Sequence, residues 1–242
     1  MAILGGSVFS RDVVLGALAV EVASLDAVLW GLSEEEAVVG TRCAPWDVAA
    51  LAAHTVRAML QVEPMLVGEP AVTGGALVSA GEYYRPDVRF SAEVNAQRVG
   101  SAVEAAARRA DAGEAGRLLR GRWSPLVARL AAEPVDRVVV TRHGDRMLLS
   151  DFLVTRVVES VLHGLDLADA LGRGPWVCGG ALDVVRGLLF GEADPAVVEG
   201  VVPGALSGRE AGVAAVRSVT GRGGGVSRGA WEGAGVRFLA LG

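Results

Sequence analysis

The sequence predicts a mainly α-helical protein with one short β-hairpin and a smaller, looser C-terminal region. Apolar residues recur at spacings of three and four over several long segments, which places them on one face of a helix. Residues 136–149 differ, because two short apolar runs there flank a polar turn that contains glycine. Glycine becomes frequent towards the end of the chain. We therefore expect a helical unit over residues 1–175 and a small C-terminal region over residues 176–242.

The first expected helix covers residues 10–32, with Ser10 as its N-cap and Val14, Leu18 and Leu25 on its inner face. The second begins near Pro45, since a proline lacks the N–H that has no partner in a first helical turn. This helix runs to about residue 60 and contains His54.

The middle of the chain combines a long connection with further helices. Residues 63–90 are rich in proline and glycine, and connections of this length often have a functional role. Ser91 then caps a helix that reaches about residue 111. Residues 113–133 are also helical in composition, and Ser124-Pro125 predicts a break where a new helix begins.

After the hairpin, Ser150 is expected to cap a long helix over residues 151–171, which Gly172 ends. Two shorter helices follow, over residues 182–190 and 209–220. Residues 221–235 contain seven glycines and are expected to be irregular.

Composition excludes several classes of protein. With 51% hydrophobic and 21% charged residues, the 242-residue chain has enough apolar surface to form a core, so it is not a disordered protein. The net charge is −5, and all 23 basic residues are arginine, with no basic stripe of the kind that binds nucleic acid. The longest apolar run near the start, residues 13–20, is shorter than the roughly 20 residues of a membrane span. No signal segment is expected at the start, so we expect a cytoplasmic protein that contacts neither membrane nor nucleic acid. A single disulfide between Cys43 and Cys178 is possible, but an acidic chain without a signal favours reduced thiols.

Two of the three histidines stand where they could bind a metal. Glu159 and His163 are four residues apart, and positions i and i+4 of a helix share one face. A third ligand would have to come from another element, and His54 on the second helix is the obvious candidate. The spacing alone leaves two other readings open: a surface pair of Glu159 and His163, and a core histidine that bonds a backbone carbonyl.

The sequence motifs around these residues resemble those of a known family. Pro45-Trp46, eight residues before His54, resembles the first helix motif of the DinB-like family, and in particular of its mycothiol-dependent maleylpyruvate isomerase branch. The segment from Arg156 to Leu167 resembles the second metal motif of that branch, R-x-x-E-x-x-x-H-x-x-D-L. Residues 216–222 and 238–242 resemble its closing motifs more loosely.

The resemblance implies a four-helix bundle with a divalent metal bound by His54, Glu159 and His163. Two imidazoles and one carboxylate are typical of a catalytic zinc site with an open position, although the same set also binds non-haem iron. Zinc is the first choice, with nickel, manganese or iron as alternatives. The resemblance also implies mycothiol as the thiol cosubstrate. The absence of lysine, with one Ile and one Asn, indicates the GC-rich genome of organisms that make this thiol.

The expected reaction is attack of a metal-bound thiolate on an electrophilic small molecule, by S-transfer or isomerisation, in secondary metabolism or detoxification. Arg156 and Asp166 are candidate catalytic residues: Arg156 could orient Glu159 or bind an anion, and Asp166 could bond the other ring nitrogen of His163. Each could equally form an ordinary salt bridge within its helix. The isomerase itself has a larger C-terminal domain with a catalytic arginine, for which Arg217 or Arg222 is a candidate here.

Three more side chains complete the prediction, and two other functions stay open. Tyr83, Tyr84 and Arg85 in the long connection could form a substrate wall, or could simply pack on the bundle. His143 is expected to be exposed in the hairpin turn, and Trp46 to be core packing. The same site could serve a hydrolase that uses metal-bound water, or a metal-binding or ligand-binding bundle without catalysis.

Overall fold

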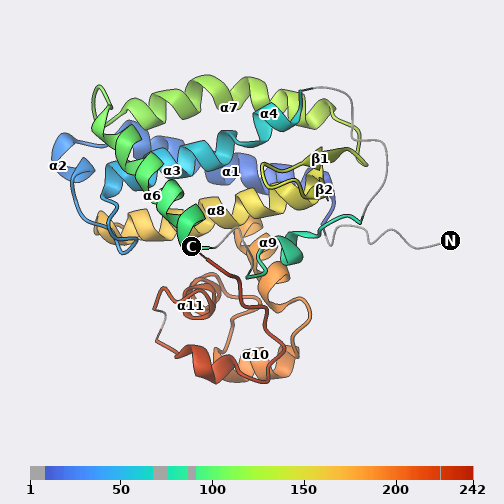
Figure 1. The fold of residues 1–242 in the computed structure, drawn as a ribbon. Helices are drawn as coiled ribbons and strands as arrows, with labels where there is room; N and C mark the ends of the chain where they lie inside the picture. The colour runs from blue at the N-terminus through green and yellow to red at the C-terminus, as the bar shows by residue number, and fades with distance from the viewer. Residues whose placement is uncertain (1–8, 68–75, 87–90, 224, 242) are drawn as a thin grey trace.

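The computed structural model describes residues 9–67, 76–86, 91–223 and 225–241. Four long antiparallel helices form a bundle (Figure 1), and a two-stranded hairpin lies at one end of it. The four are α1 (Arg11–Trp30), α3 (Val48–Leu60), α7 (Glu114–Ala132) and α8 (Leu149–Ala170). The predicted mainly helical fold is therefore confirmed.

Helix α8 is the centre of the molecule. It packs against α1, α3 and α9 (Gly179–Phe190), so that nearly every side chain of its first five turns is buried. Helix α1 closes the bundle on the side away from α3, with Val14, Leu18 and Leu25 inside as predicted. The site described below therefore stands on the most rigidly packed helix of the fold.

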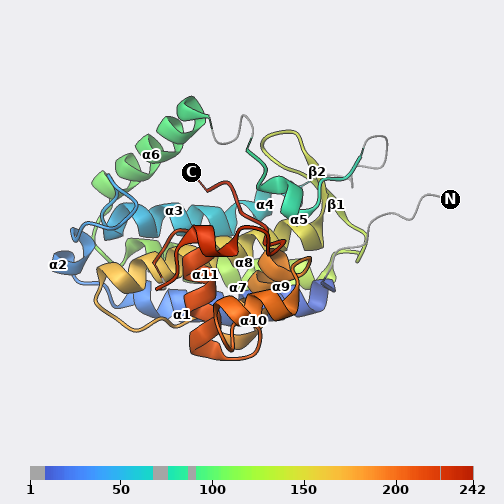
Figure 2. The same ribbon diagram turned by 90° about the horizontal axis from the view of Figure 1, so that it is seen from below.

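A fifth long helix, α6 (Ala92–Ala107), packs on α3 outside the four-helix core (Figure 2). Its N-cap is Ser91, as predicted, and only Ala102 and Ala106 of its residues are buried. Short helices connect the larger ones: α2 (Glu34–Ala37), α4 (Val62–Met65) and α5 (Ala80–Tyr83). Part of the predicted long connection, residues 68–75 and 87–90, lies outside the described residues.

The predicted hairpin is present as β1 (Val138–Val140) and β2 (Arg146–Leu148), in which Val139 faces Met147. Gly144 takes a φ of 84° in the turn, a backbone conformation that favours glycine. Arg142 and His143 of this turn line the cavity that is described below.

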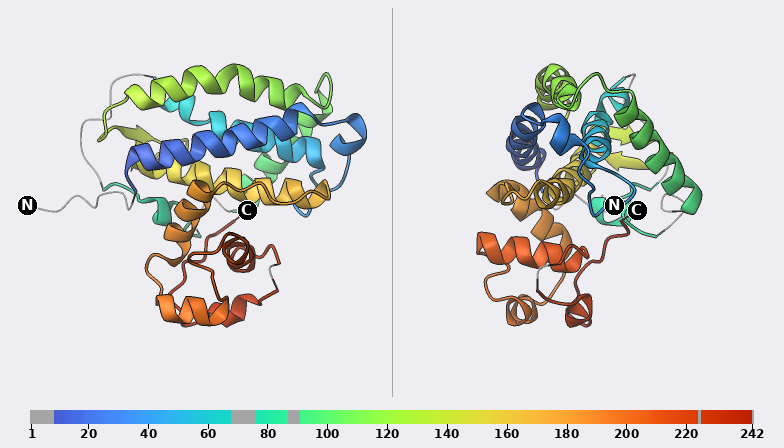
Figure 3. Two further views of the ribbon diagram at one scale, coloured as in Figure 1. Left: turned by 180° about the vertical axis from the view of Figure 1, so that it is seen from behind. Right: turned by 90° about the vertical axis from the view of Figure 1, so that its left-hand side faces the viewer.

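The elements after α8 lie beside the bundle (Figures 1 and 3). Helix α9 packs on α1 and α8, and α10 (Pro195–Val201), α11 (Arg209–Val219) and the 3₁₀ helix η2 (Arg228–Trp231) follow. Trp231 is fully buried and donates to Ser218 Oγ at 2.7 Å, so this region has a core of its own side chains. The predicted boundary at residue 175 falls between α8 and α9 and stays a prediction.

The starts of α3 and α8 differ from the sequence-based expectations, and one further helix is present. Helix α3 begins at Val48 with Asp47 as its N-cap, because Trp46 and Val48 are bonded to Thr41 and Val39 in a short backbone bridge. Helix α8 begins at Leu149 rather than after a Ser150 cap. Its first N–H donates to Arg137 O at 2.8 Å, so the helix continues directly from the hairpin. Helix α10 was not predicted.

Helix α7 runs without a break through Pro125, where the sequence predicts a new start. A proline within a helix removes one hydrogen bond and costs about 3 kcal/mol. Leu119, Trp123, Leu126 and Leu130 are buried on one face on both sides of the proline, and this packing holds the helix together.

Helix α1 is, among the described residues, long and apolar enough to cross a membrane by length and composition. In this structure its inner face packs on α7, α8 and α9. It also carries the fully buried Glu21, which accepts a hydrogen bond from the Cys178 backbone at 2.8 Å. This is the behaviour of a core helix.

Candidate metal centre

The three predicted ligands meet at one point of the structure. His54 comes from α3, and Glu159 and His163 come from consecutive turns of α8. One ligand atom of each lies within 4.8 Å of the others. All three line a cavity of about 970 Å³ between α3, α6, α7 and α8. The sequence-predicted residues are therefore brought together in space.

The burial pattern of α8 aims two of these side chains at the cavity. From Leu149 to Ala168 every residue is buried except Glu159 and His163. Neighbouring elements pack around nearly the whole of α8. The one gap in this packing lies at the Glu159 carboxylate and the His163 imidazole. The gap faces α3, where His54 stands.

The spacing of the three side chains fits one metal ion. Glu159 Oε2 lies 3.3 Å from His163 Nε2 and 3.8 Å from His54 Nε2. Two ligand atoms that are each about 2.0–2.2 Å from a tetrahedral zinc ion are themselves about 3.4 Å apart. The distances are longer than ordinary N–H···O bonds, which are about 2.9–3.0 Å. The donor set therefore fits a divalent cation such as zinc, bound with little movement of the side chains.

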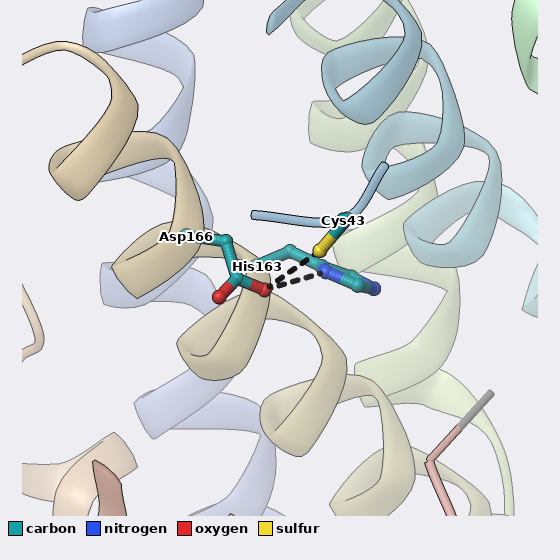
Figure 4. Close-up of side chains that lie close together, drawn as sticks. All are labelled: Cys43, His163 and Asp166. Carbon is teal, nitrogen blue, oxygen red and sulfur yellow. Dashed lines mark hydrogen bonds and ion pairs between the residues drawn. The ribbon is translucent and has the colours of Figure 1, made fainter. Parts of the chain in front are cut away.

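A buried carboxylate holds His163 from behind. Asp166 is fully buried, and its Oδ2 lies 3.3 Å from His163 Nδ1. The Cys43 thiol lies 3.4 Å from the same oxygen, as Figure 4 shows. Arg222 binds both carboxylate oxygens, at 2.9 and 2.8 Å, and Arg42 lies 3.7 Å away. The bond to Nδ1 fixes the ring so that Nε2 points at Glu159.

Cys43, His163 and Asp166 form a second group with the residue types of a metal site. In this group Asp166 is already paired with the Arg222 guanidinium, a cation in the place where a metal charge would stand. Among the described residues, no arginine forms an ion pair with Glu159. We therefore assign Cys43 and Asp166 to the support of His163 rather than to a second metal.

His54 is held by different neighbours. The Trp46 ring lies 4.6 Å from the His54 ring at an angle of 31°, and the Trp46 indole N–H donates to Val99 O in α6 at 3.3 Å. On the other side, Arg57 Nη2 lies 3.3 Å from His54 Nδ1. Trp46, predicted as core packing, is indeed buried, but it also forms part of the cavity wall.

The electrostatic environment shifts the pKa values of His54 and His163 in opposite directions. Burial, together with the charges of Arg57 and of His163, lowers the pKa of His54 to about 4, although Glu159 opposes this shift. Burial would also lower the pKa of His163, but the bonds with Asp166, Cys43 and Glu159 raise it well above its usual value. Hydrogen bonds from both imidazoles overcome the effect of burial on Glu159 and hold its pKa well below the ordinary range.

Arg156, a predicted catalytic residue, joins α8 to α3. Its guanidinium donates to Ala58 O at 3.0 Å and to Gln61 Oε1 at 3.2 Å, and it packs over the Phe152 ring. It lines the cavity and lowers the pKa of Glu159 by its charge. No direct bond between Arg156 and Glu159 is found among the described residues, so its role here is to fix the two helices.

Two of the three residues predicted to form a substrate wall lie at the cavity. Tyr83 and Tyr84 both line the cavity, and both are buried. The Tyr84 hydroxyl donates to Thr155 O at 3.1 Å, which ties this segment to α8. Arg85 is not among the residues that line the cavity. His143, expected to be merely exposed, lines it instead.

Sequence reasoning missed several residues at this site. It treated Cys43 as one of two inert thiols and did not place Arg57, Arg98 or Arg142 near the cavity. Of the two arginines proposed for the C-terminal region, Arg222 reaches the site through Asp166, whereas Arg217 pairs with Asp169 on the outer end of α8. No local spacing signals these contacts, because they join segments far apart in the chain.

Comparisons with known proteins agree with this architecture. No curated protein matches the chain. A solved structure described as the crystal structure of the mycothiol-dependent maleylpyruvate isomerase is similar, with a TM-score of 0.54 and 13% sequence identity. The match covers 90% of this chain and 92% of that one, and at this identity it shows a shared fold. The family described as the mycothiol maleylpyruvate isomerase N-terminal domain matches residues 18–168, which include all three candidate ligands. The chain belongs to this family.

Proposed function

We propose that this protein is a metal-dependent enzyme that uses mycothiol to attack an electrophilic small molecule, as a transferase or an isomerase. The family and the similar solved structure are both described by mycothiol and maleylpyruvate isomerase, which supports mycothiol as the thiol. The cavity of about 970 Å³ lies in the size range of small-molecule sites, which supports substrates of that size.

His54, Glu159 and His163 are the proposed ligands of a divalent cation, most simply zinc. When bound, such a cation deprotonates a coordinated thiol at neutral pH. Three protein ligands leave one position for that sulfur, which is the pattern of catalytic rather than structural zinc sites.

Residues around the ligands set their geometry. Asp166 holds the ring of His163, and Arg222 and Arg42 keep Asp166 charged and in place. The Trp46 ring covers one face of His54 and keeps water away from it. These contacts leave the reacting groups free to approach only from the cavity.

The single observation that carries the proposal is the burial pattern of α8. In a stretch of twenty residues from Leu149 to Ala168, only Glu159 and His163 are partly exposed, and both face His54 across the cavity. A structural ion pair has no need of an adjoining cavity, whereas a catalytic site does.

The test uses purified full-length protein, zinc, mycothiol and the model electrophile 1-chloro-2,4-dinitrobenzene. We expect formation of the thiol conjugate, followed by mass spectrometry, well above the rate in buffer. His54→Ala should return the rate to that of buffer, while Arg217→Gln, which lies outside the cavity and pairs with Asp169, should retain it. Equal rates with and without protein, across a panel of electrophiles, would refute the transferase proposal. Product that forms without any thiol would indicate hydrolysis instead.

A further inference from the structure

Helix α1 is apolar on its outer face as well as on its inner one. The inner face packs on α7, α8 and α9, while the outer face lies on the side of the bundle away from α3 (Figure 3, left). The exposed residues of α1 are Asp12, Val13, Gly16, Val20, Ala23, Ala27 and Trp30. Only the first of these carries a charge. A helix that is apolar all round is normally covered all round, so the outer face of α1 is typical of a surface that a partner covers.

The six apolar residues form one continuous stripe along the helix. We call the following set the α1 stripe: Val13, Gly16, Val20, Ala23, Ala27 and Trp30. Its members follow one another at alternating spacings of three and four, which is the spacing of the positions at which two helices pack together. The larger side chains are open to solvent, since Val13 is 56%, Val20 55% and Trp30 51% exposed.

The outer faces of other helices in the bundle are different. On α7 the exposed residues include Arg117, Arg120 and Arg129, and on α6 they include Glu93 and Glu104. Charged faces of this kind are typical of helices that meet water. The α1 stripe is therefore a local property of α1 and does not reflect the surface as a whole.

The α1 stripe matches itself when the direction of the helix is reversed. Its midpoint falls between residues 21 and 22, and its members lie in pairs at equal distances from that point. The pairs are Val13 and Trp30, Gly16 and Ala27, and Val20 and Ala23. Two copies related by a twofold axis through the midpoint would therefore place every member of one stripe against a member of the other. The tryptophan would meet a smaller valine, and the glycine and alanines would let the two backbones approach closely.

The charges at the two ends of α1 favour this antiparallel arrangement. Asp12 lies in the first turn, and 84% of its side chain is exposed. At the other end, the Arg120 guanidinium lies 3.8 Å from the centre of the Trp30 ring, with 48% of the side chain exposed. Each has one partner within its own chain, Arg11 for the aspartate and Asp26 for the arginine. Antiparallel copies bring the acidic end of one beside the basic end of the other, whereas parallel copies bring like charges together.

A lipid surface fits the α1 stripe less well than a second copy does. Helices that lie on membranes carry Lys and Arg around the apolar face, where these side chains meet anionic headgroups. This chain has a net charge of −5, and the charged residue on the exposed side of α1 is Asp12. An acidic surface of this kind is repelled by an anionic membrane.

We propose that two copies of this chain pair through the α1 stripe, with their α1 helices antiparallel, and form a twofold symmetric dimer. Within the part of the chain that the structure describes, no residue of α1 lines the cavity. The dimer therefore leaves both candidate metal centres accessible, and its formation does not depend on the reaction proposed for them.

The first test is sedimentation of the full-length protein over a range of concentrations. We expect a species of twice the mass of the chain that dissociates on dilution. Val20→Glu places two unpaired charges near the twofold axis and should weaken the dimer by about 100-fold or more. Val197→Glu, at an exposed valine of α10, is the matched control and should dimerise as the unmodified protein does. Circular dichroism checks that both variants are folded.

Two results of this test would overturn the proposal. One is a monomer at every concentration, and the other is equal association of all three proteins. A monomer that instead sediments with phosphatidylcholine vesicles, and loses this property in Val20→Glu, would assign the α1 stripe to lipid and likewise overturn the dimer.

The second test measures the direction of pairing and does not depend on the folding of Val20→Glu. Val20→Cys and Ala23→Cys are purified separately, then oxidised with copper phenanthroline either alone or as a mixture. Because position 20 of one copy faces position 23 of the other, we expect more disulfide-linked dimer from the mixture than from either variant alone. The unmodified protein gives the background from Cys43 and Cys178. Greater cross-linking of each variant with itself would indicate parallel helices and overturn the antiparallel dimer.

Discussion

Helix α8 holds His163 between two carboxylates, Glu159 and Asp166, whereas α3 holds His54 between an indole ring and a guanidinium. The two rings are 5.0 Å apart and share one cavity, yet their pKa values move in opposite directions. A metal ligand must be a neutral imidazole. The surroundings of His54 therefore favour the metal-binding form of the ring, whereas those of His163 favour the protonated form.

The two histidines of this site are held in two different ways, one by a charged hydrogen bond and one by ring packing. Asp166 fixes the orientation of His163 by a charged hydrogen bond, and it resists movement because several donors surround it. Trp46 fixes His54 by packing of the two rings, a contact in which Trp46 carries no charge. Loss of the charged support should therefore cost more than loss of the packing support.

The largest effect is expected from removal of a ligand itself. His163→Ala and His54→Ala should each lower zinc affinity by more than the roughly 10–100-fold that loss of an outer partner costs. Competition with a chromogenic chelator measures this, and metal content after purification gives an independent value. His143→Ala serves as the control. Full metal occupancy in either ligand variant would show that the ligand set is wrong.

Asp166→Asn should have the next largest effect. We expect zinc affinity to fall by about 10–100-fold, because the ring of His163 loses the partner that orients it.

The same substitution should destabilise the metal-free protein in a pH-dependent way. Burial opposes ionisation, but bonds from His163 and Arg222 lower the pKa of Asp166 from 3.8 to about 2. A carboxylate with a lowered pKa stabilises the fold above its unfolded pKa, here by about 2 kcal/mol, and loses this contribution as the pH falls towards 2. Denaturant unfolding of both proteins should show a gap that narrows as the pH falls from 5 towards 2. A gap that does not depend on pH would contradict this account.

Arg222→Gln should produce a smaller loss of metal affinity than Asp166→Asn. The variant keeps the Asp166 carboxylate, with Arg42 still 3.7 Å away, so the orientation of His163 is weakened rather than removed. Chelator competition on the two variants side by side measures the order. Arg217→Gln, at the outer end of α8, is the control and should bind zinc normally. A greater loss in Arg222→Gln than in Asp166→Asn would mean that Arg222 acts on the site by another route.

The smallest effect is expected at Trp46. Aromatic pairs contribute about 0.5–1.5 kcal/mol, so Trp46→Leu should weaken zinc binding by about two- to tenfold. Trp46→Phe keeps a ring beside His54 but loses the bond to Val99 O, so it separates stacking from hydrogen bonding. If the Phe variant binds as weakly as the Leu variant, the hydrogen bond rather than the ring supports His54.

Local signals in the sequence predicted most of the fold, whereas the three candidate ligands were predicted from their spacing together with the resemblance to a known family. The apolar spacing predicted α1, and the i, i+4 spacing placed Glu159 and His163 on one face of α8. The helix starts were less predictable, because tertiary bonds decided them. Leu149 is tied to Arg137 across the hairpin, so a serine cap at position 150 was not needed.

The rest of the site depends on contacts between distant segments, which have no local pattern. Cys43 and Arg222 meet at Asp166 from opposite ends of the chain. Likewise, Arg57 and Arg142 belong to a helix and a turn whose proximity no local pattern predicts. Such long-range pairs follow from the packing of the bundle as a whole.

The C-terminal end of the chain returns to the bundle and affects how the protein should be prepared. The Ala240 N–H donates to Tyr84 O at 2.9 Å, and Leu241 lines the cavity. A purification tag or fluorescent fusion attached after Leu241 would begin beside the cavity and compete for that space. Helix α1 starts at Arg11, which does not line the cavity, so assays are best run on protein tagged ahead of it.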